Sequence, residues 1–411
     1  MTAAALPEPA APLAPPAAAP LGTPARAGAK FATAYTAASS AMWIGLNVPS
    51  QVLIAQQVAR VDPAGKERAL AIVLVTGAVV ALVANPVAGA LSDATTSRFG
   101  RRRPWALAGG VGGAGSLLLL GAGSSVVTLT IGWALVQLTL NVLLAVLLAM
   151  VPDRIAVQQR GFVSALAGIA QVLGPVAGLG VAVAINGGFV VKYGALAGIL
   201  VLAVLPLAWF ADPPVSGVRE KQRWPRSADF GWAWLTRFLV MLGYGIGTTY
   251  LLYYLQDAVH YRPADQGVLV LTSVAGVALL ATVVAGGIWS DRAGRRRVFV
   301  AVSSAIIAAG LLVLGLAPVW PGAIAAAVLL GGGFGVYLAV DVALVTEVLP
   351  SEGDRGRDLG VVNIANALPA TLAPALCSVL VKVGGYPVMY AAATATTLLA
   401  AVLVYRIKGV R

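Results

Sequence analysis

A few ionisable residues stand inside long apolar runs of this sequence, and they are its clearest candidates for chemistry. Asp341 lies in the run 321–349, eight residues before its end. At ~1.5 Å per helical residue, that is about 12 Å from the end of a helix. A charged carboxylate is costly in such a setting, so this group is suited to taking up and releasing a proton. The alternative is a static ion pair with Arg237, which stands inside another apolar run. Glu347 lies nearer the end of its run, where a network of surface charges is the simpler role.

The composition excludes several other kinds of chemistry. Of the 411 residues, 59% are hydrophobic and 11% are charged, against roughly 25% charged in an ordinary soluble domain. The chain is too apolar for a soluble globular protein, a disordered chain or a nucleic-acid-binding domain, despite its net charge of +12. The single cysteine, Cys377, and the single histidine, His260, exclude an intramolecular disulfide and a multi-histidine metal site. The sequence has no nucleotide-binding G-x-x-x-x-G-K-[ST] loop, and we expect no metal, no cofactor and no enzymatic activity.

The rest of the sequence divides into apolar segments of about 20 residues or more, the length that crosses a bilayer. Charges, prolines or glycine clusters bound these segments, and the prolines inside them are tolerated as kinks. The twelve segments are 32–58, 67–92, 104–123, 126–151, 161–186, 191–211, 230–258, 264–290, 298–317, 321–349, 359–382 and 386–405. The predicted fold class is therefore an all-α membrane protein with twelve transmembrane helices.

The positive charges fall mainly on one side of these segments. If the N-terminus is cytoplasmic, 21 of the 28 Lys and Arg residues lie in cytoplasmic segments and 6 in outer segments. Cytoplasmic loops carry an excess of Lys and Arg, so we expect both termini to face the cytoplasm. We also expect a disordered Ala/Pro-rich tail over 1–30 and a cytoplasmic central loop over 212–229, which separates six-helix bundles over 31–211 and 230–408.

A loop is repeated in the two groups of six segments. The sequence GALSDATTSRFGRRRPW over 89–105 follows the second segment, and GIWSDRAGRRR over 287–297 follows the eighth. Asp93 and Asp291 are 198 residues apart, and the prolines that end the fourth and tenth segments share this offset. Two landmarks at one offset indicate a duplicated six-helix unit. Such repeats place a solute site between the halves, near the midplane of the membrane.

The repeated loop resembles the signature loop of the major facilitator superfamily, G-x-x-x-D-(R)-x-G-R-R-R. The resemblance covers about residues 30–408 and implies a secondary transporter that rocks two six-helix bundles around a central site. It also implies that the loops latch a cytoplasmic gate, with Asp93 near the start of the eleventh segment and Asp291 near the start of the fifth. A carboxylate there can meet the positive N-terminal end of a helix, whereas the arginines could serve only as positive-inside anchors. The gate residues implied are Gly89, Asp93, Arg98, Gly100, Arg101, Arg102, Arg103, Gly287, Asp291, Arg292, Gly294, Arg295 and Arg296.

Different features resemble different branches of this family. The first loop is longer than the second and has Ala94 after its aspartate, which resembles the glycoside–pentoside–hexuronide cation symporters and the plant-type sucrose/proton symporters. Those symporters place acidic residues inside early spans, and here none lies between Asp93 and Asp153. The stretch GPVAG over 174–178 resembles the proton antiporters that export drugs, with a kinked packing face as its alternative. The fourth segment lacks the arginine that many drug antiporters carry.

The resemblance further implies that segments one, four, seven and ten line the solute cavity. Polar and aromatic side chains at helical spacing mark the faces that would meet the solute, although each could instead join neighbouring helices. The candidates are Trp43, Asn47, Gln51, Gln137, Asn141, Tyr250, Tyr254, Phe334, Tyr337, Asn363 and Asn366. A polar and aromatic cavity that is poor in fixed charge suits a neutral solute with hydroxyl groups and some apolar surface.

These observations predict a secondary active transporter of the cell membrane that moves a small organic solute by alternating access. The first hypothesis is proton-coupled symport of a neutral sugar-like solute, with Asp341 as the coupling residue and Glu347 as the second candidate. The alternative is proton-driven export of an amphiphilic drug or metabolite, and uniport follows if Asp341 carries no proton. A membrane receptor or membrane-embedded enzyme is disfavoured. The expected partners are the solute, protons and the lipid bilayer, without nucleic acid, and we expect a monomer.

Overall fold

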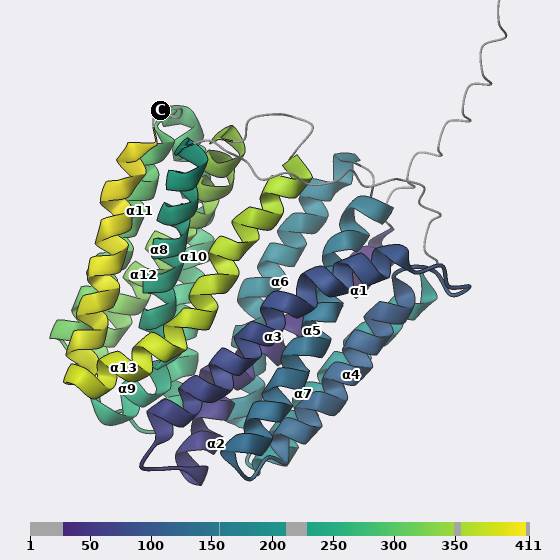
Figure 1. Ribbon diagram of the computed structural model, residues 1–411, viewed down its shortest axis with the longest axis horizontal. Helices are drawn as coiled ribbons and strands as arrows, with labels where there is room; N and C mark the ends of the chain where they lie inside the picture. The colour runs from purple at the N-terminus through teal and green to yellow at the C-terminus, as the bar shows by residue number, and fades with distance from the viewer. Residues whose placement is uncertain (1–27, 156, 211–227, 349–354, 408–411) are drawn as a thin grey trace, which may run out of the picture.

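The computed structural model describes residues 28–155, 157–210, 228–348 and 355–407 (Figure 1). Within these ranges, it describes only the backbone at 157, 228, 291, 342–348, 355–364 and 366. The expected tail and central loop lie almost wholly outside the described residues. The described residues form helices and no strands.

The first half of the chain forms six helical spans, of which the first is irregular. A π-helical turn begins at Pro49, whose missing N–H removes one helical hydrogen bond, and it joins two α-helical pieces into one span. A reciprocal capping box between Ser125 and Thr128 fixes the start of the fourth span. The elements are α1 (Ala29–Val48), η1 (Pro49–Leu53), α2 (Ile54–Val61), α3 (Lys66–Ala94), α4 (Arg103–Gly121), α5 (Val126–Arg154), α6 (Val157–Ala184), α7 (Phe189–Val204) and η2 (Leu205–Trp209).

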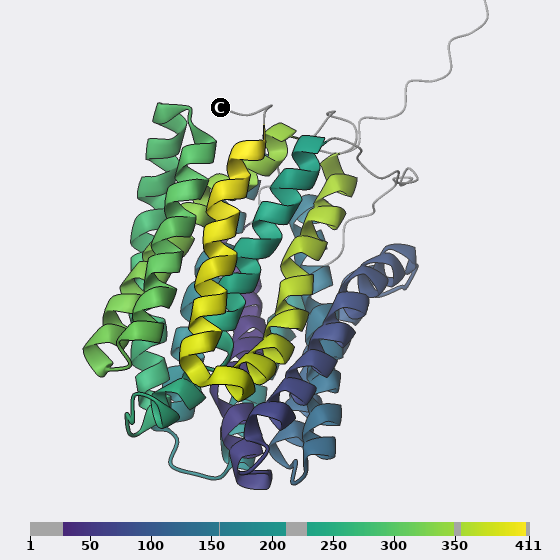
Figure 2. The same ribbon diagram turned by 60° about the vertical axis from the view of Figure 1, so that its left-hand side comes forward.

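The second half forms the other six spans, with a break in the seventh and a reversal between the eleventh and twelfth. The seventh span bends by 44° where α8 ends and α9 begins. The chain reverses inside α13 at Gly384 and Gly385, and the latter has φ 70°, a conformation that favours glycine (Figure 2). The elements are α8 (Ala228–Thr249), α9 (Leu251–Asp257), α10 (Ala264–Ala293), α11 (Arg296–Leu316), α12 (Trp320–Val348), α13 (Arg355–Leu403) and η3 (Val404–Arg406).

The predicted twelve spans can be followed in these elements. Nine of the described helices are long and apolar enough to cross a bilayer, and the bent pair α8–α9 makes a tenth. The interrupted first span and the second passage within α13 complete the twelve. The prediction of an all-α membrane protein built from twelve helices is confirmed.

The two halves repeat one packing scheme. In the first half α3 and α4 pack on α5, and in the second half α10 and α11 pack on α12. Trp133 of α5 lies so close to Gly77 of α3 that a Cβ at Gly77 would clash with the indole. The residues 198 positions later, Gly331 of α12 and Ala275 of α10, meet in the same way. The large and small partners are exchanged, yet the helices cross at the same point, which supports the duplicated unit inferred from the sequence.

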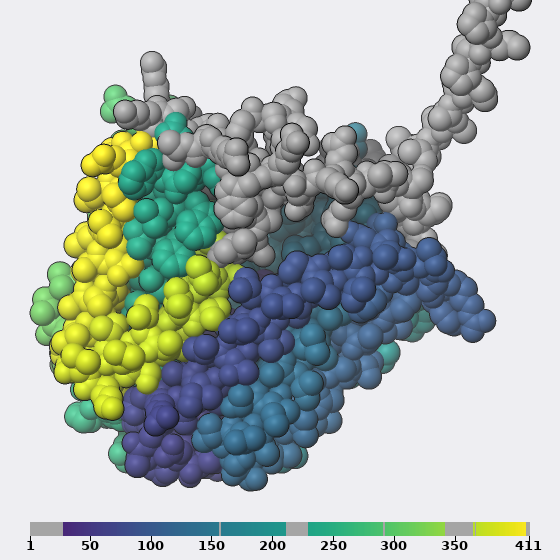
Figure 3. Space-filling model, in the orientation of Figure 1, coloured from purple at the N-terminus to yellow at the C-terminus, as the bar shows by residue number. Residues whose placement is uncertain are grey.

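The halves meet along two seams that the repeat relates to each other. α3 packs against α13, and α6 packs against α10. Figure 3 shows the first seam, where the purple-blue surface of α3 lies against the yellow-green surface of α13. We call the end of the molecule that carries the loop 95–102 the motif end. The other end, at the bottom of Figure 1, where α2 and α9 finish, is the opposite end.

Candidate functional site

An acidic cluster inside the second half joins α12 to α8. The guanidinium of Arg237 on α8 lies 2.6 Å from Oδ2 of Asp341 on α12. The Tyr337 hydroxyl, one helical turn before Asp341, donates a hydrogen bond of 2.8 Å to its other carboxylate oxygen. Asp341 is only 4% exposed and Tyr337 is fully buried. One carboxylate oxygen thus accepts a hydrogen bond and the other lies in an ion pair, so the buried charge is compensated.

Aromatic rings lead along α12 towards this cluster. The ring of Phe334 stacks on Tyr244 of α8, with centroids 4.2 Å apart and planes 13° apart. Phe334 is also nearly parallel to Tyr337, at a centroid distance of 6.1 Å. Tyr244 was not among the predicted residues, although it lies two helical turns after Arg237 on α8, and this spacing could have identified it. The cluster therefore combines an ion pair with stacked aromatic faces, on two of the four spans expected to line a cavity.

The predicted polar residues of the first half form short chains along their own helices. On the first span, the Asn47 amide donates to the Trp43 carbonyl at 3.0 Å, and the Gln51 amide lies 3.4 Å from the Asn47 side-chain oxygen. On α5, the Asn141 amide donates to the Gln137 side-chain oxygen at 2.9 Å. These amides are partly satisfied within each helix and keep further donors and acceptors.

One of these chains extends across the halves. Thr272 of α10 makes a long hydrogen bond of 3.5 Å to the side-chain oxygen of Gln51. Gln51 and Thr272 are both half-buried. The polar face of the first span therefore reaches the second half at Gln51.

Tyr250 and Tyr254 are placed differently from the other predicted aromatic residues. Both are buried, and their hydroxyls donate to the main-chain carbonyls of Glu67 at 2.5 Å and Leu314 at 2.7 Å. They lie where α8 gives way to α9, towards the opposite end, and join helices there. The side chains of Glu347, Asn363 and Asn366 lie outside the described residues.

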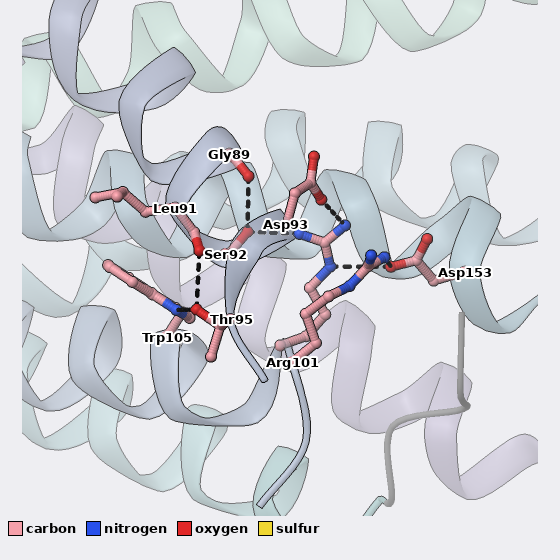
Figure 4. A network of polar contacts seen from close by, with 9 residues as sticks. Gly89, Leu91, Ser92, Asp93, Thr95, Arg101, Trp105 and Asp153 are labelled. Atoms are coloured by element: carbon pink, nitrogen blue, oxygen red, sulfur yellow. Dashed lines mark hydrogen bonds and ion pairs between the residues drawn. The ribbon is translucent and has the colours of Figure 1, made fainter. Parts of the chain in front are cut away.

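The first signature loop is held by a compact charge network at the motif end (Figure 4). Arg102 is 4% exposed; it pairs with Asp93 at 2.5 Å and with Asp153 at 2.9 Å, and donates to the Ser92 hydroxyl. Arg101 pairs with the same Asp153 oxygen at 2.8 Å. The ends of α3 and α5 are thereby tied to the start of α4.

Sequence reasoning missed Asp153 as a member of this network. It follows the proline that marks the repeat at the end of the fourth span, and this position was the available signal.

Among the other loop residues, Arg98 is exposed and lies over the ring of Phe99. Gly100 has φ 99°, and a Cβ at Gly89 would meet open space.

For the second signature loop, the structure describes the backbone and the exposure of most of the predicted residues. Gly294 ends α10 with φ 60°, the left-handed conformation of a helix C-cap. Arg292 and Arg295 are exposed, Arg296 is half-buried, and a Cβ at Gly287 would touch Ala339 at 3.9 Å. The Asp291 side chain lies outside the described residues, as do the side chains at the start of α13 that Asp93 was expected to approach.

The last arginine of each triplet makes the same contact in its half. Arg103 donates to the main-chain carbonyl of Phe210, where the sixth span ends. Arg297 donates to the carbonyl of Ile407, where the twelfth span ends, at 2.6 Å. A guanidinium suits these positions because the last carbonyls of a helix have no helical partner and carry partial negative charge. Sequence reasoning had assigned Arg103 to the gate and had not selected Arg297; the structure shows both arginines closing helix ends within their own halves.

Comparisons with known proteins agree with this architecture. The chain matches a model of the Major Facilitator Superfamily over residues 31–232 and again over 233–410. No curated protein matches the sequence. A crystal structure of a D-xylose–proton symporter is similar in fold, with a TM-score of 0.72 at 16% identity, covering 93% of this chain and 98% of that chain. The model matches nearly the whole chain, once in each half, and the protein therefore belongs to the major facilitator superfamily: it is a multi-pass membrane transporter and not an enzyme.

Proposed function

We propose that this transporter carries a neutral, sugar-like solute together with a proton across the cell membrane. The observation that supports the proposal is the buried cluster of Asp341, Arg237 and Tyr337. Charged groups inside a transmembrane bundle are costly, so those that persist there commonly serve transport or ion coupling. In this account, Asp341 is the group that takes up and releases the proton.

The ion pair gives a physical reason for the proton and the solute to bind together. A proton on Asp341 would cancel its charge and weaken its contact with the Arg237 guanidinium, which is 11% exposed. Weakening the compensation of a buried charge costs free energy. A solute hydroxyl or ring oxygen that accepts hydrogen bonds from Arg237 would relieve this cost. Solute binding and proton binding would then favour each other, because such coupling is reciprocal.

The surroundings of the cluster favour a neutral solute with hydroxyl groups. The stacked rings of Tyr244 and Phe334 offer an apolar face of the kind that packs on a sugar ring. The amides of Gln51, Gln137 and Asn141 are suited to hydroxyl groups. The D-xylose–proton symporter shares the fold at 16% identity, and its substrate agrees with this class without identifying the solute.

The distribution of Lys and Arg indicates which end of the protein faces the cytoplasm. The two arginine triplets at 101–103 and 295–297 lie at the motif end, in loops and at the starts of α4 and α11. The positive-inside rule then makes the motif end cytoplasmic. Symport driven by an inward proton gradient makes uptake into the cell the expected direction.

The direction of proton movement tests the proposal. The purified protein is reconstituted into liposomes in a weak buffer, and a panel of pentoses, hexoses and disaccharides is added outside without an imposed gradient. Symport predicts that the outside becomes alkaline in step with the entry of one of these solutes. Acidification on solute entry would indicate antiport, and solute entry without a pH change would indicate uniport; either result contradicts the proposal. Protein-free liposomes set the background.

A further inference from the structure

An ion pair at the opposite end connects the two halves of the molecule. Lys66 begins α3 in the first half, and Asp257 ends α9 in the second half. The Lys66 ammonium lies 2.7 and 2.8 Å from the two oxygens of the Asp257 carboxylate. The partners are 191 residues apart in the chain, so the contact depends on how the halves are placed.

Neighbouring groups hold both charges in position. The Tyr386 hydroxyl, just after the reversal in α13, donates to the Asp257 carboxylate at 2.8 Å. The Lys66 ammonium also lies 4.8 Å from the centre of the Tyr253 ring, a distance that allows a cation–π contact. Glu67 is at 4.0 Å from the same ammonium. Asp257 is therefore the point where donors from both halves converge.

Two further hydrogen bonds cross between the halves beside this pair. The Tyr253 hydroxyl donates to the main-chain carbonyl of Ala55 at 2.9 Å. The Tyr250 hydroxyl donates to the carbonyl of Glu67. Both tyrosines are at most 1% exposed, so the halves exclude water where they meet. These contacts require the two halves to be together at the opposite end, and they would separate if that end opened.

We propose that Lys66 and Asp257 form a latch that holds the opposite end closed and separates when this end opens during transport. The inference rests on the alternating access of the proposed function and adds the residues that set the balance between its states. The latch is suited to reversible use, because the Lys66 and Asp257 side chains keep 20% and 35% exposure. An ion pair this exposed is weak enough to break and re-form. Conformational states that differ by little free energy respond to a contact of that size.

Distances measured between the halves can test the latch without any solute. The sole native cysteine, Cys377, is replaced by serine, so that spin labels react only at introduced cysteines. One label pair is placed at Ser124 and Val319, exposed loop residues of the two halves at the opposite end. A second pair at Thr96 and Ala293 reports on the motif end. Pulsed electron paramagnetic resonance then gives the distance distribution of each pair.

The latch predicts opposite movements at the two ends. Lys66→Gln or Asp257→Asn should raise the ratio of open to closed molecules at the opposite end by about threefold. The Ser124–Val319 distances then lengthen and the Thr96–Ala293 distances shorten. Combining Lys66→Asp with Asp257→Lys should restore most of the closed population. Lys382→Gln removes an exposed lysine at the same end and should leave both distributions unchanged.

Three results would overturn the latch. They are unchanged distances in both single variants, an equal shift in Lys382→Gln, or failure of the exchanged pair to restore closure. Elution as a single species in size-exclusion chromatography shows that each variant is folded, and Asp257→Asn preserves shape if Lys66→Gln is unstable. Since the readout needs neither solute nor proton gradient, loss of the latch and failure of proton-coupled transport are separate outcomes.

Discussion

The carboxylate of Asp341 on α12 lies 2.6 Å from the guanidinium of Arg237 on α8. The sequence offered two interpretations of Asp341, a group that exchanges protons or a static ion pair, and the structure shows that the pair exists. The two interpretations are compatible, because a proton that binds the carboxylate would weaken the contact between two spans of one half. The charge state of Asp341 would then control the packing of α12 against α8.

Stacking at Phe334 predicts a role in solute affinity. Replacing Phe334 with leucine removes its stacked face against Tyr244. In the proposed function a sugar ring packs on this pair of rings, and aromatic contacts contribute roughly 0.5–1.5 kcal/mol. The KM for a transported sugar should therefore rise by about threefold to tenfold, with a small change in maximal rate. The control is Phe162→Leu, which changes a ring that is 65% exposed on α6. Equal KM values for the two variants in liposome uptake would contradict this role.

Arg102 is predicted to stabilise the motif end. Arg102→Ala would leave Asp93 and Asp153 without their shared partner. Removing one partner of a buried pair costs roughly 3–5 kcal/mol, and the cost here should be smaller because both carboxylates keep some exposure. The thermal unfolding midpoint in detergent should fall by several degrees. Arg68→Ala, at an exposed arginine, should leave it unchanged; a similar fall in both variants would refute the prediction.

The crossing of α12 and α10 predicts different tolerance at two adjacent glycines. A Cβ at Gly331 would clash with the backbone of Ala275, whereas a Cβ at Gly332 would lie at 3.7 Å from Thr282, an ordinary contact. Gly331→Ala should therefore force the helices apart and lower the thermal midpoint or the yield of monodisperse protein. Gly332→Ala should behave as the wild type. Identical behaviour of the two variants would show that this crossing is not close-packed.

Most of the fold could be predicted because a membrane permits few backbone architectures. A span needs a long apolar run, and the charges that bound such runs are visible in the sequence. The irregularities within spans were not visible. Prolines inside the spans were expected to act as kinks, but the π-helical form of the turn that begins at Pro49 was not predicted. The bend at Tyr250 is of the same kind.

The candidate site could be predicted where its contacts follow helical spacing. Tyr337 and Asp341 are four residues apart on one helix, and their hydrogen bond follows from that spacing. Tyr250 and Tyr254 show the same spacing, yet their hydroxyls bind carbonyls on other helices. Every residue has a main-chain carbonyl, so the sequence pattern does not indicate which carbonyl a side chain will contact. Asp153 was missed for a related reason, since its partners come from a loop elsewhere in the chain.

The role of Asp341 as the proton-coupling residue is tested most directly by measuring two kinds of transport with Asp341→Asn in liposomes. Asparagine keeps the shape of the side chain but cannot exchange a proton. Accumulation of the solute driven by a proton gradient should fall at least tenfold, to near the protein-free background, while exchange of labelled for unlabelled solute at equal pH continues. Asp265→Asn, a change in the first turn of α10, should accumulate solute as the wild type does. Accumulation by Asp341→Asn at the wild-type level would contradict the account.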